Sequence, residues 1–360
     1  MAFLLRDVAA TDLDDLQAAA IHLDSVNLPD DREALARIID ISTRSFAGQV
    51  PLAERCFVFV ARDEATGHVV GTSMIFAQHG SRRAPHVFFD VIEEERYSET
   101  LDRHFAHRLL RIGYNYKGLT EIGGLVLRPE YRGHPQQLGR LLVYVRFLYM
   151  GLHRATFCDE VVSELMPPLE ADGTSLLWES LGRKFTGLTY QEADALSRQN
   201  KEFIRTLFPQ DPLYATLLPA EVQRMIGEVG PETKSVERML RQLGFEYANR
   251  IDPFDGGPHF HARTDDISVV RGLVRARVAL AAPGAPGGSV LVAREEKSPP
   301  CFLAARIDGA VVTAATTTDA KDDASVAANS ATLALPAEAL PALHLAPGDE
   351  VAFLPLPTRR

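Results

Sequence analysis

Cysteine is scarce in this sequence. The 360-residue chain contains three cysteines, Cys56, Cys158 and Cys301, and no two of them form a CxxC pair. Structural zinc sites and the disulfide frameworks of secreted domains both require paired or clustered cysteines. We therefore expect neither kind of site, and the cysteine usage favours a reducing, cytoplasmic compartment.

An excess of positive charge and long apolar runs are also missing. The chain has 38 Lys and Arg against 48 Asp and Glu, a net charge of −10. Non-specific nucleic-acid binding needs a basic surface, so no nucleic-acid partner is expected. The opening MAFLLRDVAATDLDD turns acidic too early for a signal peptide, and no window approaches the roughly 20 apolar residues of a membrane span. A soluble protein without a membrane partner is expected.

Strand and helix patterns alternate along the first 270 residues, which predicts a mixed α/β (α+β) fold. Residues 56–63 and 68–78 have the apolar, β-branched character of strands, and EATG between them, with Gly67, predicts a hairpin turn. A third β-rich run covers residues 86–97. We expect the stretch that begins at Thr120 to be the next strand of a growing antiparallel sheet.

The second half of the chain predicts further elements of both kinds. Residues 159–168 read as a strand, and residues 174–190 as a helix, a glycine-marked end and a strand. A long helical region follows from about residue 191 to 243. The segment RMLRQLGFEY repeats the pattern of LLWESLGRKF, an apolar helix closed by Leu-Gly before an aromatic strand, which suggests a partial second unit of the same kind.

Composition divides the chain into three consecutive segments. Residues 1–190 hold the first mixed sheet, and residues 191–270 hold the helical region with the repeated element. Residues 271–360 are rich in Val, Ala and Thr with frequent turn residues and few chemically reactive side chains. We expect this last segment to be a small β-rich module.

The stretch TEIGGLVLRPEYRGHPQQLGRLLVYVRF (120–147) carries the first chemical prediction. It reads as a strand, a turn rich in arginine and glycine, and an amphipathic helix. A helix N-terminus offers unpaired N–H groups and the positive end of a dipole, which together suit a phosphate. Arg132 and Arg140 could add charge-assisted bonds. The alternative is an ordinary strand, turn and helix without a ligand.

A mostly antiparallel sheet interrupted by such a turn resembles the acyl-CoA N-acyltransferases (GNAT-like proteins). The resemblance implies that the turn binds the pyrophosphate of CoA and that the preceding strand offers backbone groups to the pantetheine and to the thioester oxygen. Acyl-CoA would then be a co-substrate, with no permanently bound cofactor. The expected CoA-binding residues are Leu125, Val126, Leu127, Arg132, Gly133, Gln137, Leu138, Gly139 and Arg140.

Longer motifs make the resemblance more specific. LVLRPEYRG…GRLLVYVRFLYM, LLWESLGRKFTGLTYQEAD, NKEFIRTLFPQDPLYATLLPAEVQRMIGEVGPET and LRQLGFEYANRIDPFDGGP occur in this order up to about Val270 and resemble the arginine N-succinyltransferases. This family implies a GNAT-like mixed sheet flanked by helices. It also implies transfer of a succinyl group from succinyl-CoA to the α-amine of arginine or ornithine, and an oligomer of identical or homologous subunits.

The chain departs from the family at two places. Its turn, YRGHPQQLG, is about two residues longer than the family's YRxGGNG-like turn. The family's GQVHP motif, whose histidine is regarded as the proton donor, is GEVGP here, with Gly230 at the histidine position. Two alternatives therefore stay open: a GNAT-type acyltransferase for another amine or acyl-CoA, and a catalytically reduced CoA-binding subunit that scaffolds an active partner.

Direct attack of an amine on a thioester requires proton transfer but no metal and no covalent intermediate. Glu164, on the strand after the CoA-binding helix, is a candidate catalytic group or a structural one. His259 and His261 face the same side of an extended segment and are candidates to replace the lost histidine. They could also form a metal pair or a polar strand face, but no third ligand has suitable spacing, so no metal is expected.

Four further residues are candidates for binding the acceptor. Asp252 and Asp255 lie beside a glycine turn, where they could cap the turn or bind a guanidinium. Asn200 and Lys201 match a motif of the family and could contact a carboxylate, or they could be an ordinary pair on a helix surface.

Overall fold

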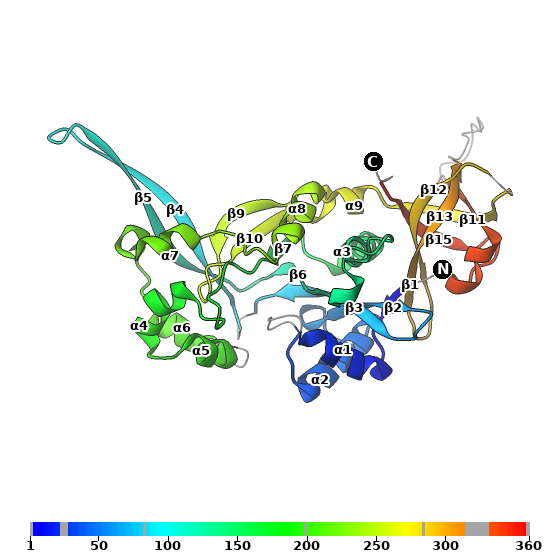
Figure 1. The fold of residues 1–360 in the computed structure, drawn as a ribbon, viewed down its shortest axis with the longest axis horizontal. Helices are drawn as coiled ribbons and strands as arrows, with labels where there is room; N and C mark the ends of the chain where they lie inside the picture. The colour runs from blue at the N-terminus through cyan, green and yellow to red at the C-terminus, as the bar shows by residue number, and fades with distance from the viewer. Residues whose placement is uncertain are drawn as a thin grey trace. The chain divides into compact units, whose positions relative to one another are not determined.

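The computed structural model describes residues 3–21, 28–81, 84–197, 200–282, 285–313 and 331–357. The chain forms two compact units (Figure 1). Unit 1 comprises Met1–Ile75, Gly124–Thr156 and Ser268–Arg360, and unit 2 comprises Phe76–Gly123 and Phe157–Ile267. These units are defined by spatial contacts, and each combines segments that are distant in the sequence. The predicted division into consecutive segments, 1–190, 191–270 and 271–360, is of another kind and stays a prediction.

The described helices do not include one that is both long enough and apolar enough to cross a membrane.

Unit 1 begins with antiparallel strands covered by helices. β1 (Phe3–Asp7) pairs with β2 (Cys56–Asp63), which continues through a turn into β3 (Val69–His79). Gly67 in this turn has a φ of +79°, as the expected hairpin requires. The helices α1 (Leu13–Ala20) and α2 (Arg32–Phe46) follow β1, and α2 packs against β2.

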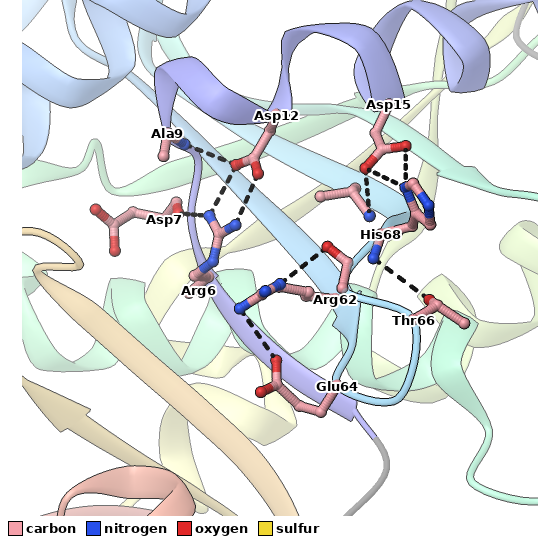
Figure 2. A network of polar contacts seen from close by, with 11 residues as sticks. Arg6, Asp7, Ala9, Asp12, Asp15, Arg62, Glu64, Thr66 and His68 are labelled. Atoms are coloured by element: carbon pink, nitrogen blue, oxygen red, sulfur yellow. Dashed lines mark hydrogen bonds and ion pairs between the residues drawn. The ribbon is translucent and has the colours of Figure 1, made fainter.

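Figure 2 shows the polar contacts at the N-terminal corner of unit 1. The buried guanidinium of Arg6 donates to both carboxylate oxygens of Asp12 at 2.7 and 2.8 Å. Asp12 also accepts the amide of Ala9, and Asp15 on α1 accepts the amide of Val69. A bidentate arginine–carboxylate pair has a fixed geometry, so it holds β1 against the start of α1.

The C-terminal segment of unit 1 is a small β module, as expected. Within the described residues it is a closed ring of five strands in the order β12-β15-β11-β14-β13, with β13 pairing back to β12. β11 and β14 are parallel and the other pairs are antiparallel. The bounds are β11 (Val274–Leu280), β12 (Gly288–Glu295), β13 (Phe302–Thr313), β14 (Ala331–Leu335) and β15 (Glu350–Pro355).

The end of β6 (Leu119–Leu127) and the helix α3 (Leu138–Leu152) also belong to unit 1, together with the short α9 (Ser268–Arg271). Ten of the fifteen residues of α3 are buried. The expectation of an amphipathic helix is therefore wrong, because α3 packs against β2, β15 and α9 rather than lying on the surface.

The strands of unit 2 form a sheet in the order β6-β7-β10-β9-β4-β5-β8. Their pairing is antiparallel except between β6 and β7, which are parallel. β4 and β5 form a long hairpin, drawn in cyan in Figure 1. The bounds are β4 (His86–Ser98), β5 (Arg103–Asn115), β7 (Glu160–Glu164), β8 (Leu213–Tyr214), β9 (Glu246–Ile251) and β10 (Pro258–Arg263).

Short helices cover the apolar core of unit 2. Trp178 lies at the centre of this core, fully buried, with its ring stacked on Phe254 at 5.0 Å. A π-helical turn (Trp178–Gly182) leads directly into α4. The helices are α4 (Arg183–Thr186), α5 (Tyr190–Ser197), α6 (Glu202–Leu207), α7 (Ala220–Met225) and α8 (Lys234–Leu243).

Two details of the predicted topology are wrong. The strand that follows β4 is β5, which the sequence reading missed because the outer half of the hairpin is exposed and mostly polar. β6 is not a neighbour of β4, and its ladder with β7 is parallel.

The repeated helix–strand element is present only once. Gly244, with φ +101°, ends α8 before β9 as expected. After Gly187 the chain enters α5 instead of a strand, because Thr189 and Glu192 cap that helix reciprocally.

Candidate functional site

The predicted CoA-binding residues of unit 1 lie on one continuous piece of backbone. Leu125, Val126 and Leu127 end β6, and a 3₁₀ turn (Pro129–Tyr131) precedes Arg132 and Gly133. The parallel ladder between β6 and β7 covers Thr120 and Glu121 and does not extend to Leu125. The backbone groups at the end of β6 are therefore not used by that ladder.

The turn leaves open space at the start of α3. Gln137 precedes the helix in the left-handed conformation, with φ 57° and ψ 48°. Its carbonyl accepts the amides of Arg140 and Leu141, whereas the amides of Leu138 and Gly139 have no acceptor within the helix. A Cβ added at Gly133 or Gly139 would meet nothing within 4 Å. A ligand can therefore approach the backbone closely here.

Two arginines flank this opening. The Nε of Arg132 donates to the carbonyl of Leu127 at 3.2 Å, and the side chain is exposed. Arg140 donates to the side-chain oxygen of Gln137 at 2.7 Å. Both contacts orient a guanidinium beside the first turn of α3, where free amides and the helix dipole already favour an anion.

In unit 2, a second group of polar side chains surrounds Glu164 at the end of β7. His259 on β10 lies directly opposite Glu164 in the antiparallel register. The Nε2 of His86, at the start of β4, lies 2.9 Å from Glu164 Oε1, and that of His259 lies 3.6 Å from the same oxygen. The rings of His86 and His259 stack at 5.2 Å. We call these residues, with His79, Asp252 and Asp255, the Glu164 cluster.

Exposure separates the members of the Glu164 cluster. The side chains of His86 and His259 are 1% and 0% exposed, whereas that of Glu164 is 28% exposed. Both ring nitrogens of His259, Nδ1 of His86 and Nε2 of His261 are buried without a hydrogen-bond partner among the described residues. Of Glu164, His86 and His259, it is Glu164 that a substrate can reach.

Burial and neighbouring charges set the protonation states in the cluster. Burial lowers the pKa of His259 to about 3 and that of His261 to about 4, so both imidazoles are neutral at pH 7. Burial alone would raise the pKa of Glu164, but the hydrogen bond from His86 favours the charged carboxylate and holds this pKa well below its usual value. Glu164 is therefore an anion at neutral pH.

Asp252 and Asp255 follow β9 and cap the glycine turn. Asp252 Oδ1 accepts the amide of Phe254 at 2.7 Å, and Asp255 Oδ1 accepts the amide of Gly257 at 2.7 Å. Burial and the charge of Glu164 raise the pKa of Asp252 to about 7, and burial with the charge of Asp252 raises the pKa of Asp255 well above its usual value. The turn thus concentrates carboxyl groups that a bound cation would stabilise.

The two residues before α6 have different surroundings. Asn200 is exposed, and its side-chain oxygen accepts the amide of Glu202, a contact that stabilises the start of α6. Lys201 is close enough for its charge to oppose the burial-driven rise in the pKa of Asp252. Lys201 thus brings a positive charge to the Glu164 cluster.

Two sets of side chains in the cluster carry atoms of the kinds that bind metals. His79, His86 and Glu164, and likewise Glu164, Asp252 and His259, have potential ligand atoms within 4.8 Å of one another. A tetrahedral zinc site with bonds of about 2.0–2.1 Å holds its ligand atoms about 3.4 Å apart. In the first set the 2.9 Å hydrogen bond already accounts for the close approach of His86 and Glu164. We assign no metal to either set.

Gly230 packs against the chain just beyond Glu164. Its amide donates to the carbonyl of Met166 at 2.8 Å. A Cβ at this position would lie 2.6 Å from the carbonyl oxygen of Pro167 and 3.0 Å from that of Met166. Backbone therefore fills the space that a histidine side chain would need in order to leave this position.

Three members of this site are not predicted from the sequence: His79, His86 and Glu121. His79 Nδ1 lies 2.7 Å from Glu121 Oε2, and the His79 ring contacts the His86 ring edge-on at 4.7 Å. No local motif marks these residues. Only the register of β4, β9, β10 and β7 brings His86 next to Glu164, so an isolated histidine before an apolar run was the sole available signal.

Known proteins match the chain over most of its length. A family profile described as arginine N-succinyltransferase beta subunit matches residues 3–269. Arginine N-succinyltransferase of Escherichia coli strain 536 is 32% identical over 286 residues, 79% of this chain and 81% of the relative. That of Enterobacter sp. strain 638 is 33% identical over 275 residues, 75% of this chain and 78% of the relative.

A solved structure agrees with these sequence matches. Arginine/ornithine succinyltransferase subunit AI from Pseudomonas aeruginosa is 28% identical and covers 99% of both chains, with a TM-score of 0.77. The expected α/β, GNAT-like fold class is confirmed by this likeness and by the sheets and helices described above. The chain belongs to the arginine N-succinyltransferase family.

Proposed function

We propose that this protein is an N-acyltransferase that moves a succinyl group from succinyl-CoA to the α-amine of arginine or ornithine. The observation that carries the proposal is membership of a family whose curated members are named arginine N-succinyltransferase. An acyl-CoA is the co-substrate of acyltransferases with this fold, and the choice of succinyl-CoA rests on the family name. No permanently bound cofactor is needed for the reaction.

The open turn of unit 1 is proposed to bind the CoA pyrophosphate. Three features support this role: the amides of Leu138 and Gly139, which have no acceptor within the helix, the space in front of Gly133, and the two flanking guanidinium groups. The backbone of Leu125, Val126 and Leu127 is proposed to bind the pantetheine, and one of its amides to donate to the thioester oxygen as negative charge develops there.

The Glu164 cluster of unit 2 is proposed to bind the acceptor and move its proton. Glu164 is the partly exposed anion, so it is assigned to accept the proton of the attacking amine. Asp252 and Asp255 are assigned to the cationic side chain of the acceptor and Lys201 to its carboxylate. His259 and His261 are buried neutral imidazoles, so their proposed contribution is to shape and polarise the site around Glu164.

Direct transfer balances without further reactants. The amine nitrogen forms a bond to the thioester carbon, the carbon–sulfur bond breaks, and the amine proton leaves through Glu164. The departing CoA thiolate takes up a proton and leaves as the thiol.

A steady-state assay tests the proposal. Succinyl-CoA is mixed with arginine or ornithine, and the release of free CoA thiol is followed. We expect turnover with at least one of the two amino acids. Turnover with acetyl-CoA but not succinyl-CoA would replace the acyl donor in the proposal.

Gly230 favours one alternative of a different class, a CoA-binding subunit that supports an active partner. The family's proton-donating histidine is replaced here, and backbone occupies the space beside it. Measurable CoA binding by calorimetry, with no turnover of any amine, would favour this alternative over the enzyme. An oligomer of identical or homologous subunits is proposed on the family resemblance, and light scattering of the purified protein would measure it.

A further inference from the structure

We propose that His86 is a positioning residue of the Glu164 cluster, whose Nε2–H donor fixes the carboxylate of Glu164 in place. This inference rests on the proposed function insofar as it concerns catalysis. The sequence reading singled out Glu164, His259 and His261 but not His86. The structure makes the bond from His86 Nε2 to Glu164 Oε1, at 2.9 Å, the shortest contact between a histidine and Glu164.

The surroundings of His86 define which nitrogen carries the proton. Its side chain is 1% exposed, so water cannot replace the bond to Glu164. Among the residues that the structure describes, the buried Nδ1 of His86 has no partner, which suits an unprotonated nitrogen better than an N–H donor. The neutral Nε2–H tautomer therefore satisfies the bond to the carboxylate at the lowest cost.

A second histidine–carboxylate pair lies behind the first. Glu121 bonds to His79, and the edge of the His79 ring meets His86 at a centroid distance of 4.7 Å. Burial would lower the pKa of His79, but the charge of Glu121 and its hydrogen bond raise it overall. The charged form of His79 opposes protonation of His86, whose pKa is lowered, mainly by burial.

The ring of His86 is also held from the opposite side by His259, stacked at 5.2 Å with an interplanar angle of 23°. His86 thus lies between two other rings, and its bond to Glu164 restrains the rotation of a partly exposed carboxylate. A misplacement of a reacting group by about 1 Å can cost about 100-fold in rate. Loss of the donor should therefore affect catalysis without contact between His86 and the substrate.

Two substitutions at one position separate the donor from the bulk of the ring. The side-chain amide of His86→Gln can place an N–H close to the position of Nε2, whereas His86→Leu has no donor. We expect His86→Leu to lower kcat by about 100-fold and to leave the KM for succinyl-CoA within twofold. His86→Gln should keep most of the rate. His104→Leu, on the exposed hairpin, is the matched control and should behave as wild type.

A titration that needs no turnover completes the test. The carboxyl of Glu164 is followed by NMR on glutamate-labelled protein, with Glu164→Gln to assign the resonance. In His86→Leu the apparent pKa of Glu164 should rise, because the hydrogen bond that favours its charged form is lost, and the acidic limb of the kcat/KM profile should move to higher pH by the same amount. His86→Gln should shift neither.

The outcomes distinguish the inference from the proposed function. If wild type turns over no amine, the proposed function fails, but the titration of Glu164 still decides the role of His86. If His86→Leu leaves both titration and rate unchanged, the inference is overturned. It is also overturned if His86→Gln and His86→Leu lose the same rate with equal thermal midpoints, because ring shape rather than the donor would then matter.

Discussion

The two halves of the proposed chemistry are built in opposite ways. The turn between β6 and α3 in unit 1 is one continuous segment, Leu125 to Arg140, and its opening consists of backbone amides and glycine positions. The Glu164 cluster in unit 2 combines side chains from β3, β4, β7, β10 and the turn after β9. The turn depends on one local stretch of backbone and tolerates a change in loop length. The Glu164 cluster instead depends on the register of several strands.

The largest expected effect is on the Glu164 cluster. Glu164→Gln keeps the shape of the side chain but cannot accept a proton, so we expect kcat to fall by about 10²–10⁴-fold with little change in the KM for succinyl-CoA. Steady-state kinetics measure both. Glu160→Gln, an exposed residue on the same strand, is the control. A loss of less than about threefold would remove Glu164 from the reaction.

The next effect tests whether the missing histidine can be restored. Gly230→His places a Cβ 2.6 Å from the carbonyl oxygen of Pro167, so we expect a loss of about 1–3 kcal/mol of stability and no gain in kcat. Thermal unfolding and the succinyl-transfer assay measure these. Gly288→His, where a Cβ meets nothing within 4 Å, should cost little. A faster Gly230→His enzyme would show that the family's proton donor still fits.

A smaller and more selective effect is expected in the turn of unit 1. Arg132→Ala should raise the KM for succinyl-CoA about tenfold, which corresponds to about 1.4 kcal/mol and to the loss of one charge-assisted contact. The KM for the amino acid should stay within twofold. Arg37→Ala, an exposed residue of α2 in the same unit, is the control. Equal increases in both KM values would argue against a pyrophosphate site.

The smallest effect concerns the pH dependence of stability. Asp252 has a pKa raised to about 7 in the folded chain, mainly by burial, against about 3.9 when unfolded. At a pH between these two values, Asp252 keeps its proton in the folded state but has lost it in the unfolded state. The free energy of unfolding therefore falls as the pH rises through this range. Asp252→Asn removes the ionisation but buries a polar amide in its place, so we expect it to recover only part of this loss.

The expected gain in thermal midpoint for Asp252→Asn is about 3 °C at pH 8, which corresponds to about 1 kcal/mol, with almost none at pH 4. Thermal melts at the two pH values measure the difference. Asp211→Asn, at an exposed position, should show no such difference. A gain of equal size at both pH values would mean that the substitution acts through packing and not through ionisation.

The contrast between the continuous turn of unit 1 and the Glu164 cluster also explains which features can be predicted from the sequence. The order β6, turn and α3 is encoded in one continuous stretch, Leu119 to Leu152, and the end of α8 is marked by Gly244, so local patterns predict both. β5 was missed because the exposed part of the hairpin carries no apolar alternation. His86 escaped because its chemistry depends on Glu164, which is distant in the sequence.

Burial altered the interpretation of residues that the sequence had singled out. His259 stands out in the sequence as a candidate acid or base, but it has no exposed surface and its pKa falls to about 3. Asp252 and Asp255 were expected either to cap a turn or to bind a cation, and the structure shows that they cap the turn. Desolvation is a property of the assembled core, so no local pattern could have predicted it.

The pairing of β1 has a consequence for synthesis on the ribosome. Leu5 pairs with Ala304 on β13, and the buried carboxylate of Asp7 accepts the amides of Cys301 and Phe302. During synthesis, β1 thus finds one of its two neighbours only after the intervening chain and β13 have been translated. Until then, β1 has one uncovered edge and Asp7 lacks its amide donors, so a chain truncated before β13 should be a substrate for chaperones and proteases.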